Sequence, residues 1–184
     1  MFRSGLTLLL LLILIPVMSC APARSEKAQQ GHASQHHHEA HHDHDEFPVQ
    51  RTEAQWQEIL PPKTFEVMRH EATERAFSHP YDKNKEDGVY YCASCGQPLF
   101  DSKHKYNSGT GWPSFYQPIK PENVGTRQDT QFFMVRTEVH CSRCGGHLGH
   151  VFDDGPRPTN LRYCMNGAAL NFKRRGLEAP TLLK

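Results

Sequence analysis

The 184-residue sequence predicts a mainly antiparallel β domain that is preceded by two short helices and carries a four-cysteine metal site. Three observations lead to this prediction. Short aromatic and β-branched runs, separated by Gly, Pro, Asn and Asp, fill the C-terminal half and are typical of β-strands. No helical hydrophobic period follows about residue 73. Two C-x-x-C-G motifs, at Cys92–Gly96 and Cys141–Gly145, together supply four cysteines.

The region before these strands, within residues 48–184, predicts the two helices. Thr52-Glu53-Ala54-Gln55 has the form of a capping box, and Pro61-Pro62 ends the helix that it begins. Pro62 also suits the first position of a second helix, which is expected to end near Thr73. The apolar positions expected to share the buried face are Trp56, Ile59 and Leu60 in the first helix and Phe65, Met68 and Ala72 in the second.

The first twenty residues, MFRSGLTLLLLLILIPVMSC, have the composition of a secretory signal. Arg3 gives a basic start, and the apolar run from Leu6 to Val17 is too short to span a bilayer comfortably. A short membrane anchor that stays attached is the alternative. Because Val17-Met18-Ser19-Cys20 resembles a bacterial lipobox, residues 1–19 are predicted to be a lipoprotein-type signal peptide and Cys20 to be lipidated. The mature chain would be exported and tethered to the cell envelope, facing the periplasm or the cell surface.

Residues 20–47 are predicted to form a flexible tether, since they have almost no large apolar side chains with which to build a core. The stretch GHASQHHHEAHHDHDEF holds seven of the thirteen histidines, mixed with carboxylates. Imidazole and carboxylate ligands suit Zn, Ni or Cu, so the tether could capture extra metal ions. A solvated spacer without metal is the alternative.

The two C-x-x-C-G motifs predict one structural zinc site. Each turn directs two sulfurs to the same side, and the following glycine permits the tight backbone. Four thiolates form the closed tetrahedral ligand set of structural zinc. Because 45 residues separate Cys95 from Cys141, the two turns are expected to come from separate hairpins. In an exported chain the pairs could instead form disulfides or act as redox motifs.

Cys164, in LRYCMNG, belongs to neither pair. A free cysteine is most often a small buried hydrophobe. Here Arg162 lies two residues earlier on the same side of a strand, where its charge favours a thiolate, and Asn166 adds a donor two residues later. Other candidates for this site are His147 and His150 for proton transfer and Trp112 for an apolar wall. Together these residue types predict a cysteine enzyme that acts on a small apolar sulfur or carbonyl group.

Several long motifs resemble those of the B-type methionine sulfoxide reductases: NKEDGVYYCASCGQPLF, NSGTGWPSF, CSRCGGHLGHVFDDGPRPTNLRYCMN and ALNF. The resemblance runs in order from about Thr52 to Lys173, and the leader and histidine tract lie outside it. It implies that residues 48–184 are a catalytic domain of two antiparallel sheets with N-terminal helices and one zinc ion. The implied activity is reduction of methionine (R)-sulfoxide, chiefly within oxidised proteins, as repair under oxidative stress.

The resemblance also implies a role for each matching residue. Cys164 is expected to attack the sulfoxide sulfur and to become a sulfenic acid, and Trp112 to hold the substrate's ε-methyl group. The residues implied in proton transfer and in arranging the site are His150, which protonates the sulfoxide oxygen, His147 beside it, Asn166 and Arg162. The implied zinc ligands are Cys92, Cys95, Cys141 and Cys144.

One position departs from the pattern of many family members. They carry a resolving cysteine in the loop where this sequence has Thr110, which cannot form a disulfide. We therefore expect an external thiol, such as a thioredoxin-like reductant, to reduce the oxidised Cys164 directly.

Two functions of other classes compete with this prediction. In one, the chain is a metal-handling lipoprotein whose histidine tract is the working part. In the other, the cysteine turns form a zinc-knuckle module for proteins or nucleic acids. A net charge of +1 and the lack of a basic aromatic stripe argue against a nucleic-acid partner.

Overall fold

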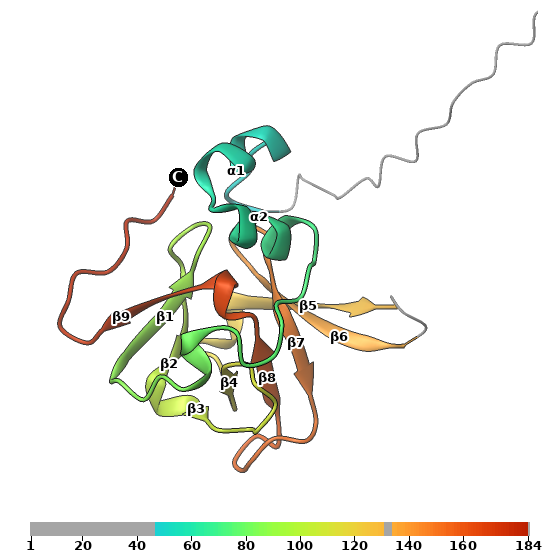
Figure 1. Ribbon diagram of the computed structural model, residues 1–184, viewed down its shortest axis with the longest axis vertical. Coiled ribbons are helices and arrows are strands. Elements are labelled where there is room, and N and C mark those ends of the chain that lie inside the picture. Colours follow the sequence, from blue (N-terminus) through green and yellow to red (C-terminus); the bar gives the residue numbers. More distant parts are fainter. Residues whose placement is uncertain (1–46, 131–133, 184) are drawn as a thin grey trace, which may run out of the picture. The chain divides into compact units, whose positions relative to one another are not determined.

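Two antiparallel sheets and two short helices form the domain in the computed structural model, which describes residues 47–130 and 134–183 (Figure 1). The mainly β prediction, with two antiparallel sheets and N-terminal helices, is confirmed. The predicted signal peptide, the lipidation site at Cys20 and all but the last residue of the tether lie outside the described residues. Within the described ranges, no helix is long and apolar enough to cross a membrane.

The two sheets differ in size and together contain nine strands of the described chain. The smaller has the strand order β2-β1-β9, with β1 at Gly88–Cys92, β2 at Pro98–Asp101 and β9 at Leu170–Arg174. The larger has the order β3-β4-β8-β7-β6-β5. Its strands are β3 Lys105–Tyr106, β4 Ser114–Phe115, β5 Val124–Asp129, β6 Arg136–Cys141, β7 His147–Phe152 and β8 Arg162–Met165. Single 3-10 turns connect several strands, namely η2 Ser102–His104, η3 Pro121–Asn123 and η5 Gly167–Ala169, and a further one, η1 Pro80–Asp82, lies between α2 and β1.

Helix α1, Glu53–Ile59, begins at the predicted capping box. The Thr52 side chain accepts from the Gln55 backbone N–H at 3.3 Å, and the Gln55 side chain accepts from the Thr52 N–H at 2.9 Å. Trp56 and Leu60 are buried as predicted. The prediction for Ile59 was wrong, because its side chain is 48% exposed.

Helix α2, Pro62–Arg69, begins at the predicted proline but ends before the predicted Thr73. Glu71 has a φ of 55°, in the left-handed region that a right-handed helix cannot include. The chain therefore leaves the helix at His70, and only Phe65 and Met68 of the predicted face are buried within it. Ala72 lies beyond the helix end and packs against the core from there.

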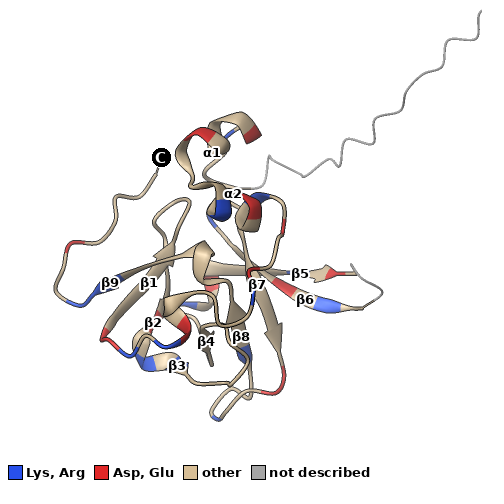
Figure 2. Cartoon of the chain, viewed as in Figure 1, with Lys and Arg blue, Asp and Glu red and all other residues tan. Residues whose placement is uncertain are grey.

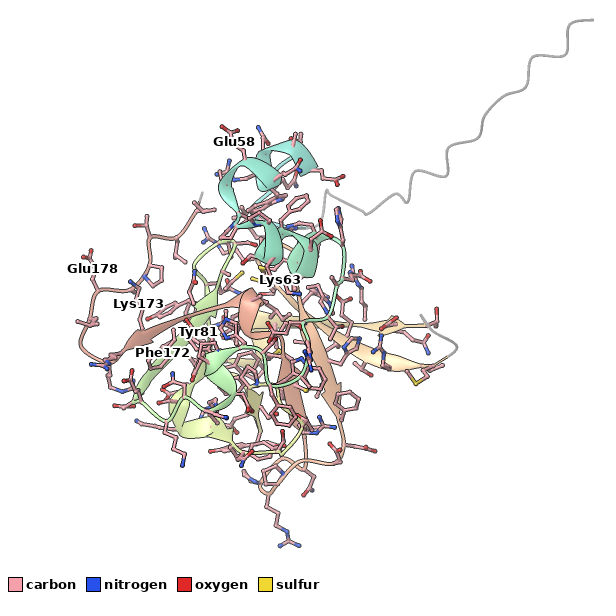
Figure 3. All side chains as sticks on the ribbon, viewed as in Figure 1. Glu58, Lys63, Tyr81, Phe172, Lys173 and Glu178 are labelled. Atoms are coloured by element: carbon pink, nitrogen blue, oxygen red, sulfur yellow. The ribbon has the colours of Figure 1, made fainter. Side chains whose placement is uncertain are left out.

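The core between the sheets is aromatic. Phe100 of β2 stacks on Phe115 of β4, with ring centroids 4.5 Å apart, and Tyr90 of β1 meets Phe115 edge-on at 5.0 Å. All three rings are fully buried. Aromatic pairs of this kind stabilise a core beyond the effect of area alone. Beside them, the Tyr81 hydroxyl accepts from the Phe172 backbone N–H at 3.0 Å, and the two labelled rings lie together in Figure 3.

Charged positions of both signs are interspersed over the described elements (Figure 2). On the small sheet, Arg175 donates to Asp87 and to Asp101, and Arg174 pairs with Glu86. Apart from Asp101, these groups are largely exposed, where ion pairs contribute little to stability.

Candidate active site

The six-stranded sheet aligns polar residues in one row that crosses all of its strands. Directly paired residues on adjacent antiparallel strands present their side chains on the same face. Cys164 on β8 pairs with His150 on β7 and with Ser114 on β4. From β5 to β3, the row consists of Arg127, Glu138, His150, Cys164, Ser114 and Tyr106. The unpaired cysteine therefore lies in the middle of the sheet, directly beside one of the two predicted imidazoles.

Cys164 is half-buried, and this burial raises the pKa of its thiol above the ordinary value. The Thr110 hydroxyl, whose Oγ1 lies 3.8 Å from the sulfur, and the charge of Arg162 both lower that pKa. Arg162 thus acts in the direction predicted from the sequence, but burial outweighs it. Burial therefore favours the neutral thiol over the thiolate.

The guanidinium of Arg162 is fixed from two sides. Its Nε and Nη2 donate to the two carboxylate oxygens of Asp154 at 2.7 and 2.8 Å. Its Cζ lies 4.3 Å from the ring centroid of Phe152, its cross-strand partner. A bidentate carboxylate and an aromatic face leave the guanidinium little freedom. The positive charge is therefore held at one place, two residues from Cys164.

His150 is hydrogen-bonded to Asp129, the last residue of β5. Its Nε2 lies 2.8 Å from Asp129 Oδ2, which also accepts from Arg136 at 2.6 Å. Burial lowers the pKa of His150, and the hydrogen bond with Asp129 offsets this only in part. Because the ionised carboxylate can only accept, Nε2 of His150 carries the proton and donates to it, and Nδ1 of the neutral ring is unprotonated. His150 can release a proton from Nδ1 only after taking one up.

His147 belongs to a buried network of charges. Its Nδ1 lies 2.7 Å from Glu138 Oε1, and the two side chains are 2% and 3% exposed. Arg127 donates to the same carboxylate and, at 2.6 Å, to Glu71. Among the described residues, none partners the Nε2 of His147. The rings of His147 and His150 lie 5.4 Å apart, so the fold brings both predicted imidazoles together but attaches each to a different acid.

We expect Glu138→Gln to lower the free energy of unfolding by about 1.5–3 kcal/mol at pH 7, the range for hydrogen bonds to charged groups. Burial opposes ionisation of Glu138, but His147 and Arg127 outweigh it and hold the pKa of the carboxyl below its usual value. A lowered pKa stabilises the fold above the unfolded-state value of about 4.3, and this stabilisation is lost as pH falls through the folded value. Urea unfolding at pH 7 and at about pH 3.5 measures the difference, which should shrink in acid. A difference that does not vary with pH would contradict this expectation.

Trp112 lies in a glycine-bounded loop that is hydrogen-bonded to the segment after α2. Gly111, with a φ of 91°, accepts from the Phe77 N–H at 2.8 Å, and a Cβ added to it would collide with Phe77. The Trp112 Nε1–H donates to the Glu74 carbonyl at 3.0 Å. The next residue, Pro113, accepts from the Met165 N–H at 3.0 Å, beside Cys164. These contacts fix the half-buried indole in a loop beside Cys164.

Asn166 follows the last residue of β8, and its side chain binds backbone on two sides. Oδ1 accepts from the Glu74 N–H at 3.1 Å, and Nδ2 donates to the Leu148 carbonyl at 3.3 Å. The buried Glu74 carboxylate accepts from the N–H groups of Gly167 and Ala168 at 2.5 and 3.0 Å. Asn166 thus positions the turn that follows Cys164, and both ends of its amide are used for that purpose.

The four cysteines of the C-x-x-C turns converge on one buried point. One pair of cysteines ends β1 and turns into β2, and the other ends β6 and turns into β7, so the turns come from different sheets. The Sγ atoms of Cys92 and Cys144 lie 3.7 Å apart, those of Cys95 and Cys141 lie 3.6 Å apart, and all four lie within 4.8 Å of one another. These two separations are far above the S–S bond length of about 2.05 Å, and all four cysteines are free thiols in this structure. A tetrahedral ion with bonds of about 2.3 Å requires sulfurs about 3.8 Å apart, which these residues provide.

The glycines after the two turns have the conformation that the motif predicts. Gly96 and Gly145 have φ values of 78° and 66°, and their N–H groups donate to the carbonyls of Cys92 and Cys141, both at 2.9 Å. Arg69 of α2 donates to the Cys144 carbonyl at 3.0 Å and stacks on Trp56 at 4.1 Å. The helices therefore pack on the metal site as well as on the core.

Comparison with known proteins agrees with this geometry. A family model described as the SelR domain matches residues 60–174, which is more than half of the chain. The peptide methionine sulfoxide reductase MsrB of Methanosarcina barkeri is 55% identical over 125 residues, covering 68% of this chain and 88% of that protein. The protein of the same name from Leptospira interrogans is 50% identical over 128 residues, covering 70% and 98%. That of Methylibium petroleiphilum is 53% identical over 127 residues, covering 69% and 92%.

The fold and its two cysteine sites thus define a SelR-domain protein. The chain belongs to the B-type methionine sulfoxide reductase family, as the motifs in its sequence predicted. The matched residues lie within the predicted catalytic domain, 48–184, while the boundaries of leader and tether stay predictions.

Four acidic residues of the site were not identified from the sequence. Asp154 could have been identified from the sequence, because two consecutive aspartates directly follow the HLGHVF strand. Asp129, Glu138 and Glu74 could not, because their partners lie 21, 9 and 92 residues away in the sequence. Strand pairing brings Asp129 and Glu138 to the site, and hydrogen bonds of the segment after α2 bring Glu74 there.

Proposed function

We propose that this oxidoreductase reduces methionine (R)-sulfoxide in oxidised proteins to methionine, with Cys164 as the nucleophile. Its relatives are named peptide methionine sulfoxide reductases, which supports the reaction class. The observation that carries the proposal is the position of Cys164, directly paired with His150 and flanked by the fixed Trp112 loop. A sulfur nucleophile, a proton carrier and an aromatic wall are the groups that sulfoxide reduction requires.

The proton balance of the reaction follows from the shifted pKa values of Cys164 and His150. A raised pKa at Cys164 and a lowered pKa at His150 together favour the neutral thiol and imidazole in the free enzyme. Transfer of the thiol proton to His150 Nδ1 gives a thiolate and an imidazolium. The thiolate attacks the sulfoxide sulfur while His150 protonates the oxygen. The oxygen passes to Cys164, which becomes a sulfenic acid, and methionine leaves.

An epimer-resolved assay tests the proposal. Dabsyl-methionine (R)-sulfoxide should be turned over with dithiothreitol as reductant, because the fixed indole gives the methyl group one position. The S epimer is the matched control and should react at least about 100-fold more slowly. Turnover confined to the S epimer, or no turnover of either, would refute the proposal.

Regeneration of Cys164 is proposed to depend on an external thiol. Thr110 stands where a resolving cysteine would be needed, and the other four cysteines of the described chain form the metal site. The external thiol attacks the Cys164 sulfenic acid, releases water and leaves a mixed disulfide, which a second thiol reduces. A thioredoxin-like protein would supply both thiols.

After one turnover without reductant, we expect Cys164 to persist as a sulfenic acid that dimedone labels. Mass spectrometry of the unreduced peptides measures this adduct. The same measurement after addition of thioredoxin should show its loss. An intramolecular disulfide that includes Cys164 would contradict the expectation.

We also propose that the four-cysteine site holds a structural zinc ion. Its sulfurs fit a tetrahedral ion, and four thiolates leave no open position for a substrate. Bound zinc would join the two hairpin turns, and no step of the reaction passes through it.

Export and envelope anchoring through a lipid on Cys20 are proposed from the leader sequence alone. Intact mass spectrometry of the cellular protein decides this, because an unmodified Cys20 or cleavage after Ala23 excludes the anchor. The histidine tract is proposed to collect additional metal ions. Zinc titration followed by calorimetry, on the full chain and on a variant lacking residues 32–44, should show weak extra sites only in the former.

A further inference from the structure

Three hydroxyl groups connect the sulfur of Cys164 to a backbone carbonyl. Thr110 Oγ1 lies 3.8 Å from the sulfur and 2.8 Å from Ser108 Oγ. Ser108 Oγ lies 2.7 Å from Ser114 Oγ, and Ser114 donates to the Trp112 carbonyl at 3.2 Å. We refer to Thr110, Ser108 and Ser114 as the hydroxyl chain.

The backbone fixes the oxygens of the hydroxyl chain. Ser114 is fully buried on β4 and is a direct strand partner of Cys164. The Thr110 N–H donates to Ser108 Oγ at 3.4 Å, and the Gly109 N–H donates to the Asn107 side chain at 3.0 Å. A hydroxyl hydrogen still turns about its C–O bond while its oxygen stays in place. The direction of the chain is therefore free to change without movement of the loop.

We propose that the hydroxyl chain reverses its direction when Cys164 ionises, so that Thr110 accepts from the thiol and donates to the thiolate. The inference rests on the proposed role of Cys164 as the nucleophile. The chain is not a path for protons, because it ends at a backbone carbonyl that cannot take one up. The thiol proton leaves to His150 or to solvent, and each hydroxyl keeps its own hydrogen.

The distances between the oxygens show why the reversal involves all three groups. With a thiol, the S–H donates to Thr110, Thr110 to Ser108, Ser108 to Ser114, and Ser114 to the carbonyl of Trp112. With a thiolate, Thr110 must donate to sulfur. If Ser108 did not turn, two oxygens 2.8 Å apart would face each other without a hydrogen between them. Every arrangement with a thiolate loses one hydrogen bond. When all three groups turn, the two oxygens left without a hydrogen between them are Ser114 Oγ and the Trp112 carbonyl oxygen, whose separation of 3.2 Å is the longest between oxygens in the chain, so the repulsion is smallest.

The reversal predicts opposite effects for two variants. Thr110→Val keeps the shape but removes the donor to the thiolate, and a hydrogen bond to a charged group is stronger than one between neutral groups. The pH at which Cys164 is half ionised should rise by about one unit, which is about tenfold less thiolate at a given pH. Ser108→Ala leaves Ser114 bonded to the Trp112 carbonyl in both states, so ionisation no longer loses that bond. The pH at which Cys164 is half ionised should therefore fall by about half a unit. The free energy of one neutral hydrogen bond is larger than the weakening of about 10–30% per bond that follows when a polarised chain is shortened.

The measurement is the rate of Cys164 alkylation by iodoacetamide against pH, read on the Cys164 peptide by mass spectrometry so that other cysteines do not interfere. Thr110→Ser keeps a hydroxyl and is the matched control, with a wild-type profile expected. Metal content and thermal unfolding establish that each variant is folded. A Thr110→Val profile equal to wild type, or an equal shift in Thr110→Ser, overturns the role of the hydroxyl. A Ser108→Ala profile that is unchanged or shifted upward overturns the reversal. Because no sulfoxide is present, these outcomes are independent of whether the enzyme reduces the R epimer.

Discussion

We expect Cys164→Ser to lower kcat/KM for methionine (R)-sulfoxide by at least about 10³-fold, the range seen when a nucleophile is removed. A serine hydroxyl is a far weaker nucleophile than a thiolate. It would also have to accept oxygen from the sulfoxide and form a weak O–O bond in place of a sulfenic acid. Residual turnover with dithiothreitol above about 1% of wild type would show that another group carries the reaction.

The chain offers a matched control for this prediction. Cys20→Ser changes the other cysteine outside the metal site, and the purified variant should keep its activity. Loss of activity in Cys164→Ser is informative only if the variant is folded, so its metal content and unfolding midpoint should equal those of wild type. A competing metal-handling function would leave metal binding by the histidine tract unchanged in the same variant.

The second large effect is expected at the four-cysteine site. Cys144→Ser should lose the metal ion and lower the free energy of unfolding by several kcal/mol. Binding of a structural metal contributes directly to folding free energy, and a domain has only about 5–15 kcal/mol in total. The effect is large because the four sulfurs join β1–β2 in one sheet to β6–β7 in the other. Without the ion, three buried thiols and the introduced serine hydroxyl remain, and the two hairpins lose their link.

Metal analysis by plasma mass spectrometry and thermal unfolding with and without a chelator measure this effect. Cys164→Ser is the matched control, since it removes a cysteine from the same domain without touching the cluster. It should retain about one equivalent of metal and the wild-type unfolding midpoint. Retention of stoichiometric metal and full stability in Cys144→Ser would contradict a structural metal site.

Local features of the fold could be predicted because neighbouring residues produce them. The Thr52 capping box and the start of α2 at Pro62 are set by groups within one helical turn, and both are present. The end of α2 was misjudged because Glu71 has a φ of 55° although it is neither glycine nor proline. The sequence therefore gives no sign of this change in the backbone. The exposure of Ile59 depends on what packs beside α1, which no local pattern records.

The sequence by itself predicted the residues that we propose to carry the chemistry. A cysteine outside the C-x-x-C pairs, two histidines and a tryptophan in a glycine-bounded loop were recognisable as residue types in motifs. Side chains two residues apart on a strand share a face, so Arg162 could be placed near Cys164 without a structure. The metal site was also predictable, because each C-x-x-C turn is a local structure.

Only the tertiary structure decided which groups act on one another. Strand register places His150 opposite Cys164, Glu138 opposite His150, and Ser114 on the other side of the sulfur. These pairings join residues between 12 and 50 positions apart, and a shift of one residue would turn every side chain to the other face. Burial, which raises the pKa of Cys164 against the effect of Arg162, is likewise a property of the packed molecule. The residue types are local information, whereas register and burial arise from contacts between distant segments.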